Sequence, residues 1–413
     1  MKKSTENENR LVIFLCWAAY TAAYLGRLNL NAYIEPIRDQ LGATKTELGL
    51  VSSFFFFSYG IGQLVHGILS RKYNTRYSVA IALVGSAVVN VTMAFCANVE
   101  LMKYIWLLNG VFQSVLWSSV IKTLSEYMRD DMLSKAVVVI STPPALGTFL
   151  AYGLSATFSS FSIKYKWIFI LPAIILILIG VVWFLILGKL KDKKAFINNL
   201  NKKESNKKMS LTPIFIISFV FLVIAAISNG FIKDGVTTWT PSILKESYGV
   251  KESLSILATV ALPLIAILGA FISTALHKKM KNTSALNGFL YLTEIVILSL
   301  VLFTARSSVF KNPVVLLVLF GISAMLMSAV NNVITSIIPL YMREKMDSGL
   351  LAGVLDTFCY VGSTLSTAHL GFIADNSGWA GVFNCLLIFG FAACLVCWLS
   401  VAVEKRNINQ QNN

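Results

Sequence analysis

Hydrophobic residues gather along this chain in long blocks, separated by short stretches rich in glycine, proline and charged residues. Most blocks exceed 20 residues, which at 1.5 Å per residue in a helix crosses a hydrocarbon core of roughly 30 Å. The pattern predicts twelve membrane-spanning helices, near residues 11–34, 47–70, 77–98, 101–128, 135–160, 167–188, 211–240, 253–276, 284–305, 313–341, 348–374 and 378–403.

Composition agrees with an integral membrane protein. Of 413 residues, 56% are hydrophobic and only 13% are charged, against about 25% charged residues in a soluble domain. No connecting segment is long enough for a soluble domain. The first apolar segment, Leu11–Ile34, contains an arginine and lacks a small-residue cleavage pattern, so we interpret it as a retained span and not a signal peptide.

Lysine and arginine are distributed unevenly between the two sides of the predicted membrane. The chain ends and the even-numbered connections contain 23 of them, and the odd-numbered connections contain 9. By the positive-inside rule this predicts a multi-pass protein of the cytoplasmic membrane with both termini in the cytoplasm. The same distribution explains the net charge of +15 without a nucleic-acid partner.

The longest connection, Lys189–Ser210, contains eight lysines. It divides the chain into an N-terminal six-helix half (1–188), a basic cytoplasmic linker (189–210) and a C-terminal six-helix half (211–413). We interpret the connection as a solvated linker that fixes topology; attraction to anionic lipid is the alternative.

The two halves resemble each other around a buried cation. Arg27 lies in the first span and Lys233 in the first span of the second half, 206 residues later, and each is followed by a proline and a glycine at distances that agree to within one residue. A charge at this depth costs roughly 2.5–3.5 kcal/mol on insertion scales, so it faces the protein interior or a cavity. Two such cations in equivalent places predict an anion site at the interface of two six-helix halves, the architecture of a major facilitator transporter.

Helical spacing identifies further candidates for this site. Tyr20, Tyr24, Arg27 and Asn31 share one face of the first span, and Asn229, Lys233, Thr237 and Thr240 share one face of the seventh. Such polar stripes face a cavity or other helices, so substrate contact and structural hydrogen bonding both remain open for the uncharged members. The predicted substrate-binding set is Arg27, Lys233, Tyr24, Asn31, Lys122, Trp117, Asn229, Asn332 and Tyr360.

Charged residues elsewhere in the spans have two interpretations each. Lys122 either joins the anion site or extends to the cytoplasmic interface and pairs with Glu126. Asp356, Asp234 and Glu294 either carry protons or form ion pairs with embedded bases, and for Asp356 the partner would be Lys233 or Lys122.

The sequence gives no indication of a metal site, a cofactor site or an enzyme active site. The CxxC of Cys394 and Cys397 has neither a second pair nor a nearby histidine, so the cysteines are interpreted as packing residues. No glycine-rich phosphate loop, nucleophile elbow or pair of catalytic carboxylates is present. We expect a monomeric protein without a cofactor that is not an enzyme.

Several motifs together resemble the organophosphate:phosphate antiporter family of the major facilitator superfamily, which includes bacterial glycerol-3-phosphate and hexose-phosphate transporters. They are Tyr24-Leu-Gly-Arg27-Leu-Asn29, then Phe112-Gln113 with Trp117 and Lys122-Thr123, then Asp234-Gly235 through Trp239-Thr240-Pro241 and Leu244-Lys245-Glu246, and finally Gly353 to Gly362, Gly371-Phe-Ile-Ala-Asp375 and Gly378-Trp379. The resemblance implies that Arg27 contacts a substrate phosphate.

The chain also departs from the family pattern. Lys233 and Lys122 stand where the family has arginines, and lysine is a point charge where arginine offers a planar fork. Pro144 falls where glycerol-3-phosphate transporters have a histidine, and Arg71 replaces the acid of a cytoplasmic loop motif.

The resulting expectation is a secondary active transporter that exchanges an organophosphate for inorganic phosphate by alternating access, with Arg27 and Lys233 holding the anion. The alternative is a proton-coupled symporter of an organic carboxylate such as a sugar acid, in which an embedded acid carries the proton. A third possibility is a transporter-like membrane sensor of a sugar phosphate. The expected partners are a small anionic substrate, inorganic phosphate or a proton as coupling species, and the lipid bilayer.

Overall fold

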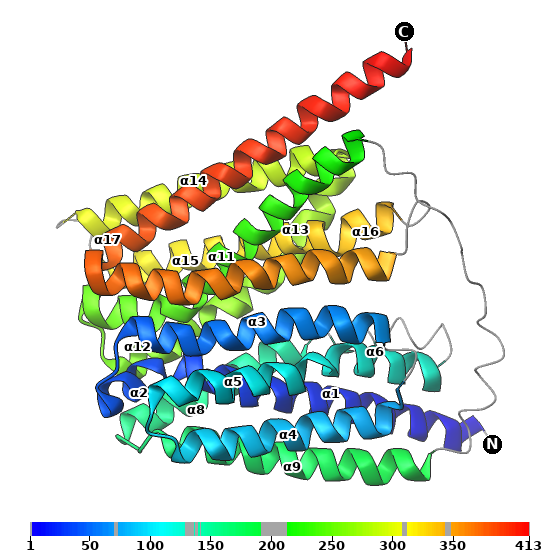
Figure 1. Ribbon diagram of the computed structural model, residues 1–413, viewed down its shortest axis with the longest axis vertical. Coiled ribbons are helices and arrows are strands. Elements are labelled where there is room, and N and C mark those ends of the chain that lie inside the picture. Colours follow the sequence, from blue (N-terminus) through cyan, green and yellow to red (C-terminus); the bar gives the residue numbers. More distant parts are fainter. Residues whose placement is uncertain are drawn as a thin grey trace.

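The computed structural model describes residues 2–69, 73–128, 136, 139–140, 142–190, 213–307, 312–342 and 348–412, and this part of the chain is built from helices. Most of the long helices run side by side along one direction (Figure 1). In chain order they are α1 (Lys2–Ala32), α2 (Ile34–Leu41), α3 (Lys45–Leu69), α4 (Thr75–Phe95), α5 (Val99–Ser114), α6 (Leu116–Tyr127), α8 (Pro143–Ser160), α9 (Lys166–Lys189), α11 (Pro213–Tyr248), α12 (Glu252–Thr259), α13 (Ala261–Lys279), α14 (Thr283–Arg306), α15 (Pro313–Asn332), a π-helical turn (Val333–Ile337), α16 (Ile338–Tyr341) and α17 (Ser348–Asn412).

Ten helices in the described part of the chain are long and apolar enough to cross a membrane. One of these, Leu350–Glu404, breaks at Gly378, where φ is 68° and ψ is −178°, so it contains the two final predicted spans. The fifth predicted span corresponds to α8, which begins at Pro143, and residues 129–135 of the preceding connection lie outside the described part. The all-helical membrane fold that the sequence predicts is therefore confirmed.

Several spans differ from the prediction in their internal breaks. The first span ends at Ala32, and Tyr33 redirects the chain into the short helix α2, whereas α11 continues through Pro241 as far as Tyr248. The tenth span contains the π-helical turn, a feature that often accompanies functional sites. Residues 191–210 of the predicted basic linker (189–210) lie outside the described part, as does Arg71.

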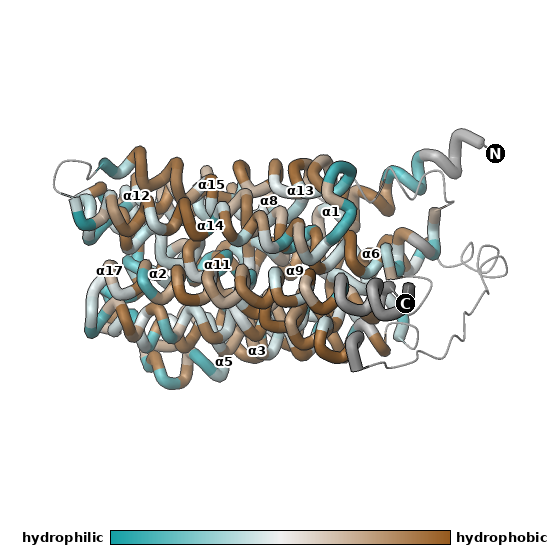
Figure 2. Tube along the Cα trace, turned by 90° about the horizontal axis from the view of Figure 1, so that it is seen from above, coloured by the Kyte–Doolittle hydropathy of each residue, from teal (hydrophilic) through white to brown (hydrophobic). Residues whose placement is uncertain are grey.

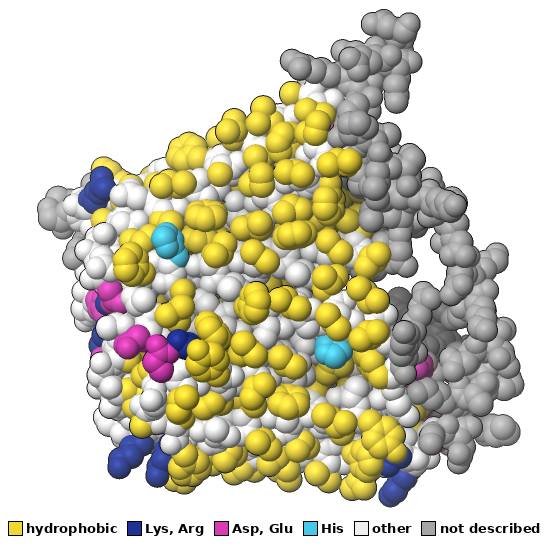
Figure 3. Space-filling view, in the orientation of Figure 1, with side chains coloured by type: hydrophobic (Ala, Val, Ile, Leu, Met, Phe, Trp, Pro, Cys, Tyr) yellow, Lys and Arg dark blue, Asp and Glu magenta, His cyan; other side chains and the backbone are white. Residues whose placement is uncertain are grey.

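The helices form two groups that correspond to the two parts of the sequence. Helices α1–α9, which we call the first-half helices, lie in the lower part of Figure 1, and α11–α17, the second-half helices, lie mainly in the upper part. Hydrophobic residues dominate the length of the helices (Figure 2), and hydrophobic side chains cover much of the face in Figure 3. Large apolar residues such as Phe14, Phe271 and Ile388 are more than half exposed, as expected where the surroundings are lipid.

Within the second half, α11 and α17 approach closely through two glycines. A Cβ atom on Gly230 would collide with the carbonyl oxygen of Cys359, and one on Gly362 would collide with the carbonyl oxygen of Ile227. Small residues allow helices to pack backbone to backbone in a membrane, where apolar side chains gain little by leaving lipid.

At one end of the bundle the two helix groups exchange ion pairs in a reciprocal way. Arg38 of α2 lies 2.6 Å from Glu246 of α11, and Lys245 of α11 lies 2.7 Å from Asp39 of α2. Arg38-Asp39 and Lys245-Glu246 are basic–acidic pairs 207 residues apart. We call this end, on the left of Figure 1 and opposite the N-terminus, the ion-paired end.

The same repeat continues into the turns that follow. Gly42 and Gly249 both adopt a φ of 65°, which is accessible to glycine at low cost, and their N–H groups bond back toward Arg38 and Lys245. The exchange of equivalent contacts resembles the self-complementary interface of a two-fold dimer, here within one chain.

A buried carboxylate connects the two ion pairs. Glu35 is 1% exposed, lies 2.9 Å from Arg38 and 3.6 Å from Lys245, and accepts a 2.5 Å hydrogen bond from Ser242. Burial raises the pKa of Glu35 above its ordinary value, although the hydrogen bond and both cations act in the opposite direction. For Asp39, burial alone would raise the pKa, but Lys245 and Arg38 outweigh it and lower the pKa.

Replacing Gly362 with alanine should destabilise the protein, because the added methyl group meets backbone that cannot move independently. We expect a loss of about 1–3 kcal/mol in the free energy of unfolding, the usual cost of overpacking. Gly353→Ala, in the same helix, is the matched control because nothing lies within 4 Å of the place that its methyl group would occupy. Thermal unfolding in detergent measures both; equal stability of the two variants would contradict the close packing.

A double-mutant cycle on Arg38→Gln and Glu246→Gln should show energetic coupling between the helix groups. Contacting charged residues typically couple by about 0.5–3 kcal/mol, so the double variant should be more stable than the sum of the single losses predicts. The control is a cycle on Glu100 and Lys103, an ion pair within α5 whose glutamate is 72% exposed, which should give weaker coupling because water screens the charge. Additive effects of the Arg38 and Glu246 changes on the thermal unfolding midpoint would show that the ion pair contributes nothing.

Candidate binding cavity between the two helix groups

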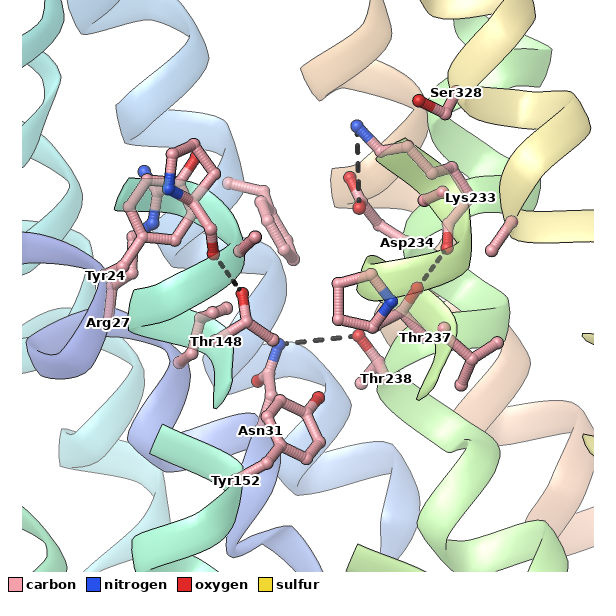
Figure 4. A pocket seen from close by; sticks show the side chains of 18 of the residues that line it. Tyr24, Arg27, Asn31, Thr148, Tyr152, Lys233, Asp234, Thr237, Thr238 and Ser328 are labelled. Atoms are coloured by element: carbon pink, nitrogen blue, oxygen red, sulfur yellow. Dashed lines mark hydrogen bonds and ion pairs between the residues drawn. The ribbon is translucent and has the colours of Figure 1, made fainter. Parts of the chain in front are cut away.

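A cavity of about 340 Å³ lies between the first-half and second-half helices (Figure 4). Its size is within the range of small-molecule sites. The first half contributes side chains from α1, α3, α5 and α8, and the second half from α11, α13, α15 and α17. Its polar lining consists of Tyr24, Arg27, Asn31, Ser52, Thr148, Tyr152, Lys233, Asp234, Thr237, Thr238, Ser328, Asn331 and Tyr360, with Trp106.

Arg27 on α1 supplies a buried cation to one wall. It is 9% exposed, and its guanidinium carbon lies 3.6 Å from the ring centroid of Tyr24 and 5.1 Å from that of Tyr59. Cation–π contacts of this kind stabilise a desolvated guanidinium by about 2 kcal/mol without neutralising it. Within the described part of the chain no carboxylate forms a salt bridge with Arg27, so its charge remains available to an anion.

The opposite wall carries a cation that already has a partner. The ammonium of Lys233 lies 3.7 Å from one carboxylate oxygen of Asp234, and the other oxygen accepts a 2.5 Å hydrogen bond from Ser363 of α17. Consecutive helical residues point about 100° apart, but the long lysine side chain bends back to reach its neighbour, as Figure 4 shows. The two walls therefore differ in charge.

Toward the ion-paired end, the two helix groups meet across the cavity. The amide nitrogen of Asn31 on α1 lies 3.4 Å from the hydroxyl of Thr238 on α11, and Asn31 accepts a 2.6 Å hydrogen bond from Ser52 of α3 (Figure 4 shows the first contact). These contacts join α1, α3 and α11 one helical turn from the two cations.

Five of the nine predicted substrate-binding residues line this cavity: Tyr24, Arg27, Asn31, Lys233 and Tyr360. These five side chains come from both halves of the sequence. Helical spacing could show which residues share a face within one span, but not which spans face each other. Tyr360 of α17 also contacts Tyr59, with ring centroids 4.9 Å apart, and so extends the aromatic wall around Arg27.

The other four predicted residues lie outside the cavity lining and have structural contacts. Lys122 donates to the carbonyl oxygen of Tyr73 at 2.8 Å and lies 3.8 Å from Glu126, which agrees with the interfacial alternative for this lysine. Trp117 packs against Tyr20, with ring centroids 5.2 Å apart.

Asn229 and Asn332 make hydrogen bonds between helices of the second half. Asn229 donates to the carbonyl oxygen of Met327 at 2.7 Å, and Asn332 donates to the hydroxyl of Ser273 at 2.9 Å. Asn229 therefore follows the structural interpretation left open for the uncharged stripe residues, and Asn332 likewise makes a hydrogen bond between helices.

The three embedded acids occupy different environments. Asp234 lines the cavity, and Asp356 of α17 lies beside it, where Lys233, Asp234 and Arg27 are its charged neighbours. Among the described residues no salt bridge joins Asp356 to Lys233 or Lys122. Glu294 is fully buried between α14 and α15, where it accepts a 2.5 Å hydrogen bond from Ser323, away from the cavity.

Sequence reasoning missed several residues around the cavity. Thr148 and Tyr152 of α8 line it, as does Pro144, and Tyr59 of α3 faces Arg27. Thr148 and Tyr152 are one turn apart, a weak stripe that could have been found in the sequence. The contact of Tyr59 with Arg27 depends on the packing of α3 against α1, and the sequence contains no direct signal for it.

The described residues contain no cluster of three or more histidine, cysteine, aspartate or glutamate side chains suited to a metal ion. The cavity instead offers one unneutralised guanidinium, a lysine–aspartate pair, hydroxyl and amide groups, and aromatic surface. This set can bind and orient a small anion.

The chain is 25% identical to the glycerol-3-phosphate transporter of Bacillus subtilis, over 93% of this chain and 91% of the relative. It is 23% identical to the hexuronate transporter of the same organism, over 92% and 91%. Among solved structures, an inward-facing bacterial homologue of the human lysosomal transporter Spinster matches with a TM-score of 0.72 and 14% identity, over 96% of this chain and 97% of that one.

These relatives are transporters and not enzymes, and the first of them is consistent with the resemblance to organophosphate:phosphate antiporters. Residues 16–346, most of the chain, match the Major Facilitator Superfamily. The chain therefore belongs to the Major Facilitator Superfamily of membrane transporters.

Proposed function

We propose that this protein is a secondary active transporter that exchanges an organophosphate for inorganic phosphate. The observation that carries the proposal is the buried, unneutralised guanidinium of Arg27 in a cavity between the two helix groups, facing Lys233. A guanidinium can grip a phosphate at two oxygens, and a low-dielectric site strengthens that attraction relative to water. Similarity to a glycerol-3-phosphate transporter supports the same substrate class.

Transport follows from alternating access to this cavity. The N-terminal half (1–188) and the C-terminal half (211–413) rock against each other, so that the ion-paired end opens while the opposite end closes. The excess of lysine and arginine on one side supports a bacterial-type cell membrane with both termini in the cytoplasm and the ion-paired end outside. Each chain carries its own cavity, so we propose that it acts as a monomer.

Exchange follows from the charge of the empty cavity. Closing the helix groups around Arg27 without an anion would bury an uncompensated charge, which is unfavourable. A bound organophosphate or phosphate removes this penalty, so reorientation in either direction requires an anion.

Proton-coupled symport of an organic carboxylate is the second candidate. Asp234 lines the cavity and Asp356 lies beside it, so a carboxyl group that exchanges protons would be next to the bound anion. The hexuronate transporter among the relatives gives this candidate independent support.

Proteoliposomes loaded with inorganic phosphate should take up glycerol 3-phosphate or a hexose phosphate when no pH gradient is present. Vesicles without internal phosphate are the control and should take up little, because the empty carrier does not reorient. The measurement is uptake of radiolabelled substrate. Uptake that requires an inward proton gradient and is indifferent to internal phosphate would instead establish the symport candidate.

Arg27→Gln should reduce this exchange by at least about 100-fold, because removing a hydrogen-bonded charge pair costs roughly 3 kcal/mol or more. Lys122→Gln is the matched control, because it also removes a cation from a membrane span but lies outside the cavity lining. It should retain most of the activity. Full exchange by the Arg27 variant, with normal amounts of folded protein in the membrane, would exclude the central anion site.

A further inference from the structure

At one position of the internal repeat the two walls of the cavity differ in charge. Arg27 and Lys233 are equivalent, 206 residues apart, but the residue after Arg27 is Leu28 and the residue after Lys233 is Asp234. Both Leu28 and Asp234 line the cavity. The second half therefore supplies a carboxylate where the first supplies an apolar side chain.

We infer that the cavity binds its substrate as a singly charged anion, and that Asp234 sets this selectivity by neutralising Lys233. The inference rests on the proposed function, in that it assigns the charge of the anion that the same cavity transports. Asp234 acts as a specificity-determining residue.

Asp234 contacts one cation and one hydroxyl donor. One oxygen lies 3.7 Å from the Lys233 ammonium and the other accepts a short hydrogen bond from Ser363. Two residues of other helices interact electrostatically with Asp234. They are Tyr152 of α8 and Asp356 of α17.

Counting these charges limits the anion that fits. Arg27 and Lys233 contribute two positive charges, and Asp234 removes one. Ionisation of Asp356 would remove another. While Asp234 is ionised, the net charge of the site is thus at most +1, which one negative charge on the substrate balances.

A doubly charged anion would have to compete with Asp234 for Lys233. Its second negative charge would approach a carboxylate inside a desolvated site, where like charges repel strongly and an uncompensated charge is costly to bury. A singly charged anion can bind Arg27 and leave the Lys233–Asp234 pair intact.

Two kinds of anion satisfy this requirement. A sugar acid carries one negative charge at any pH well above about 4. A phosphate monoester carries one charge below its second pKa of about 6 and two above it. Both kinds of anion can present a singly charged head group. Binding measured at different pH values distinguishes them, because only the phosphate monoester gains a second charge.

The test is the pH dependence of binding to the purified full-length protein, measured by calorimetry with glycerol 3-phosphate and glucuronate as probes. Between pH 6 and pH 8 the singly charged fraction of the phosphate ester falls about 50-fold, so its Kd should rise about 50-fold. Glucuronate keeps one charge, and its Kd should change less than about threefold. Titration of protein groups acts on both probes, so the difference between them reports the charge of the ester.

Variants at Asp234 assign the effect to this residue. Asp234→Asn keeps a group that can accept the Ser363 hydrogen bond but releases Lys233, so the rise in Kd for glycerol 3-phosphate should shrink to less than about fivefold. Asp234→Glu retains the charge and should retain most of the pH dependence.

Each outcome is decisive. Wild-type binding of glycerol 3-phosphate that is equal or tighter at pH 8 would overturn the inference while leaving phosphate-ester transport intact. An unchanged 50-fold rise in Asp234→Asn would overturn the role of Asp234. Binding of glucuronate alone would support a singly charged substrate and contradict organophosphate exchange. Failure of both probes at every pH would overturn the proposed function and this inference with it.

Discussion

Charged side chains inside a bilayer have to be turned toward protein and given partners, because lipid cannot solvate them. The three embedded cations of this protein meet that requirement differently. Arg27 lies against tyrosine rings, Lys233 pairs with its neighbour Asp234, and Lys122 reaches a backbone carbonyl near the helix end. Of these three cations, only Arg27 has no acid or carbonyl oxygen bound to it in the described part of the chain, which makes it the cation best able to bind an anion.

The internal repeat organises both the cavity and the ion-paired end. Arg27 and Lys233 occupy equivalent places, and about ten residues further on Arg38-Asp39 and Lys245-Glu246 exchange ion pairs. Equivalent segments that meet across a pseudo-two-fold axis can form the same contact twice, so one sequence pattern provides two ion pairs. The two halves differ in the cavity lining, where Asp234 of the second half corresponds to Leu28 of the first.

The sequence predicted the features that local physics controls. Apolar length determined the membrane spans, and a helical period of 3.6 residues correctly grouped Tyr24, Arg27 and Asn31 on the face that lines the cavity. The sequence could not show how far along each span the cavity extends. Asn229 lies on a polar stripe but bonds to Met327, and Trp117 of a resembling motif packs against Tyr20, because the packing of neighbouring helices decides which side chains face the cavity.

Backbone details were also beyond the sequence. Tyr33–Pro36 and Trp239–Pro241 each place an aromatic residue shortly before a proline, yet the first contains a break between α1 and α2 and the second lies inside a continuous helix. Proline within a membrane helix is tolerated when neighbouring helices pack around it, and that context is tertiary. The same limit applies to the Lys233–Asp234 pair, since spacing gives the directions of the Cβ atoms but not the path of a flexible lysine side chain.

This difference between the two halves has a consequence for coupling between the cavity and the ion-paired end. Lys233 and Lys245 lie on one uninterrupted helix, so a displacement of α11 caused by an anion at the cavity reaches the Asp39 ion pair directly. Arg27 and Arg38 are separated by the turn at Tyr33, so movement of α1 reaches α2 through a joint. On the proposed mechanism, α11 is therefore the element that transmits substrate binding to the opening of the ion-paired end. The Asn31–Thr238 contact lies between the two sites, so a displacement of α11 relative to α1 changes it.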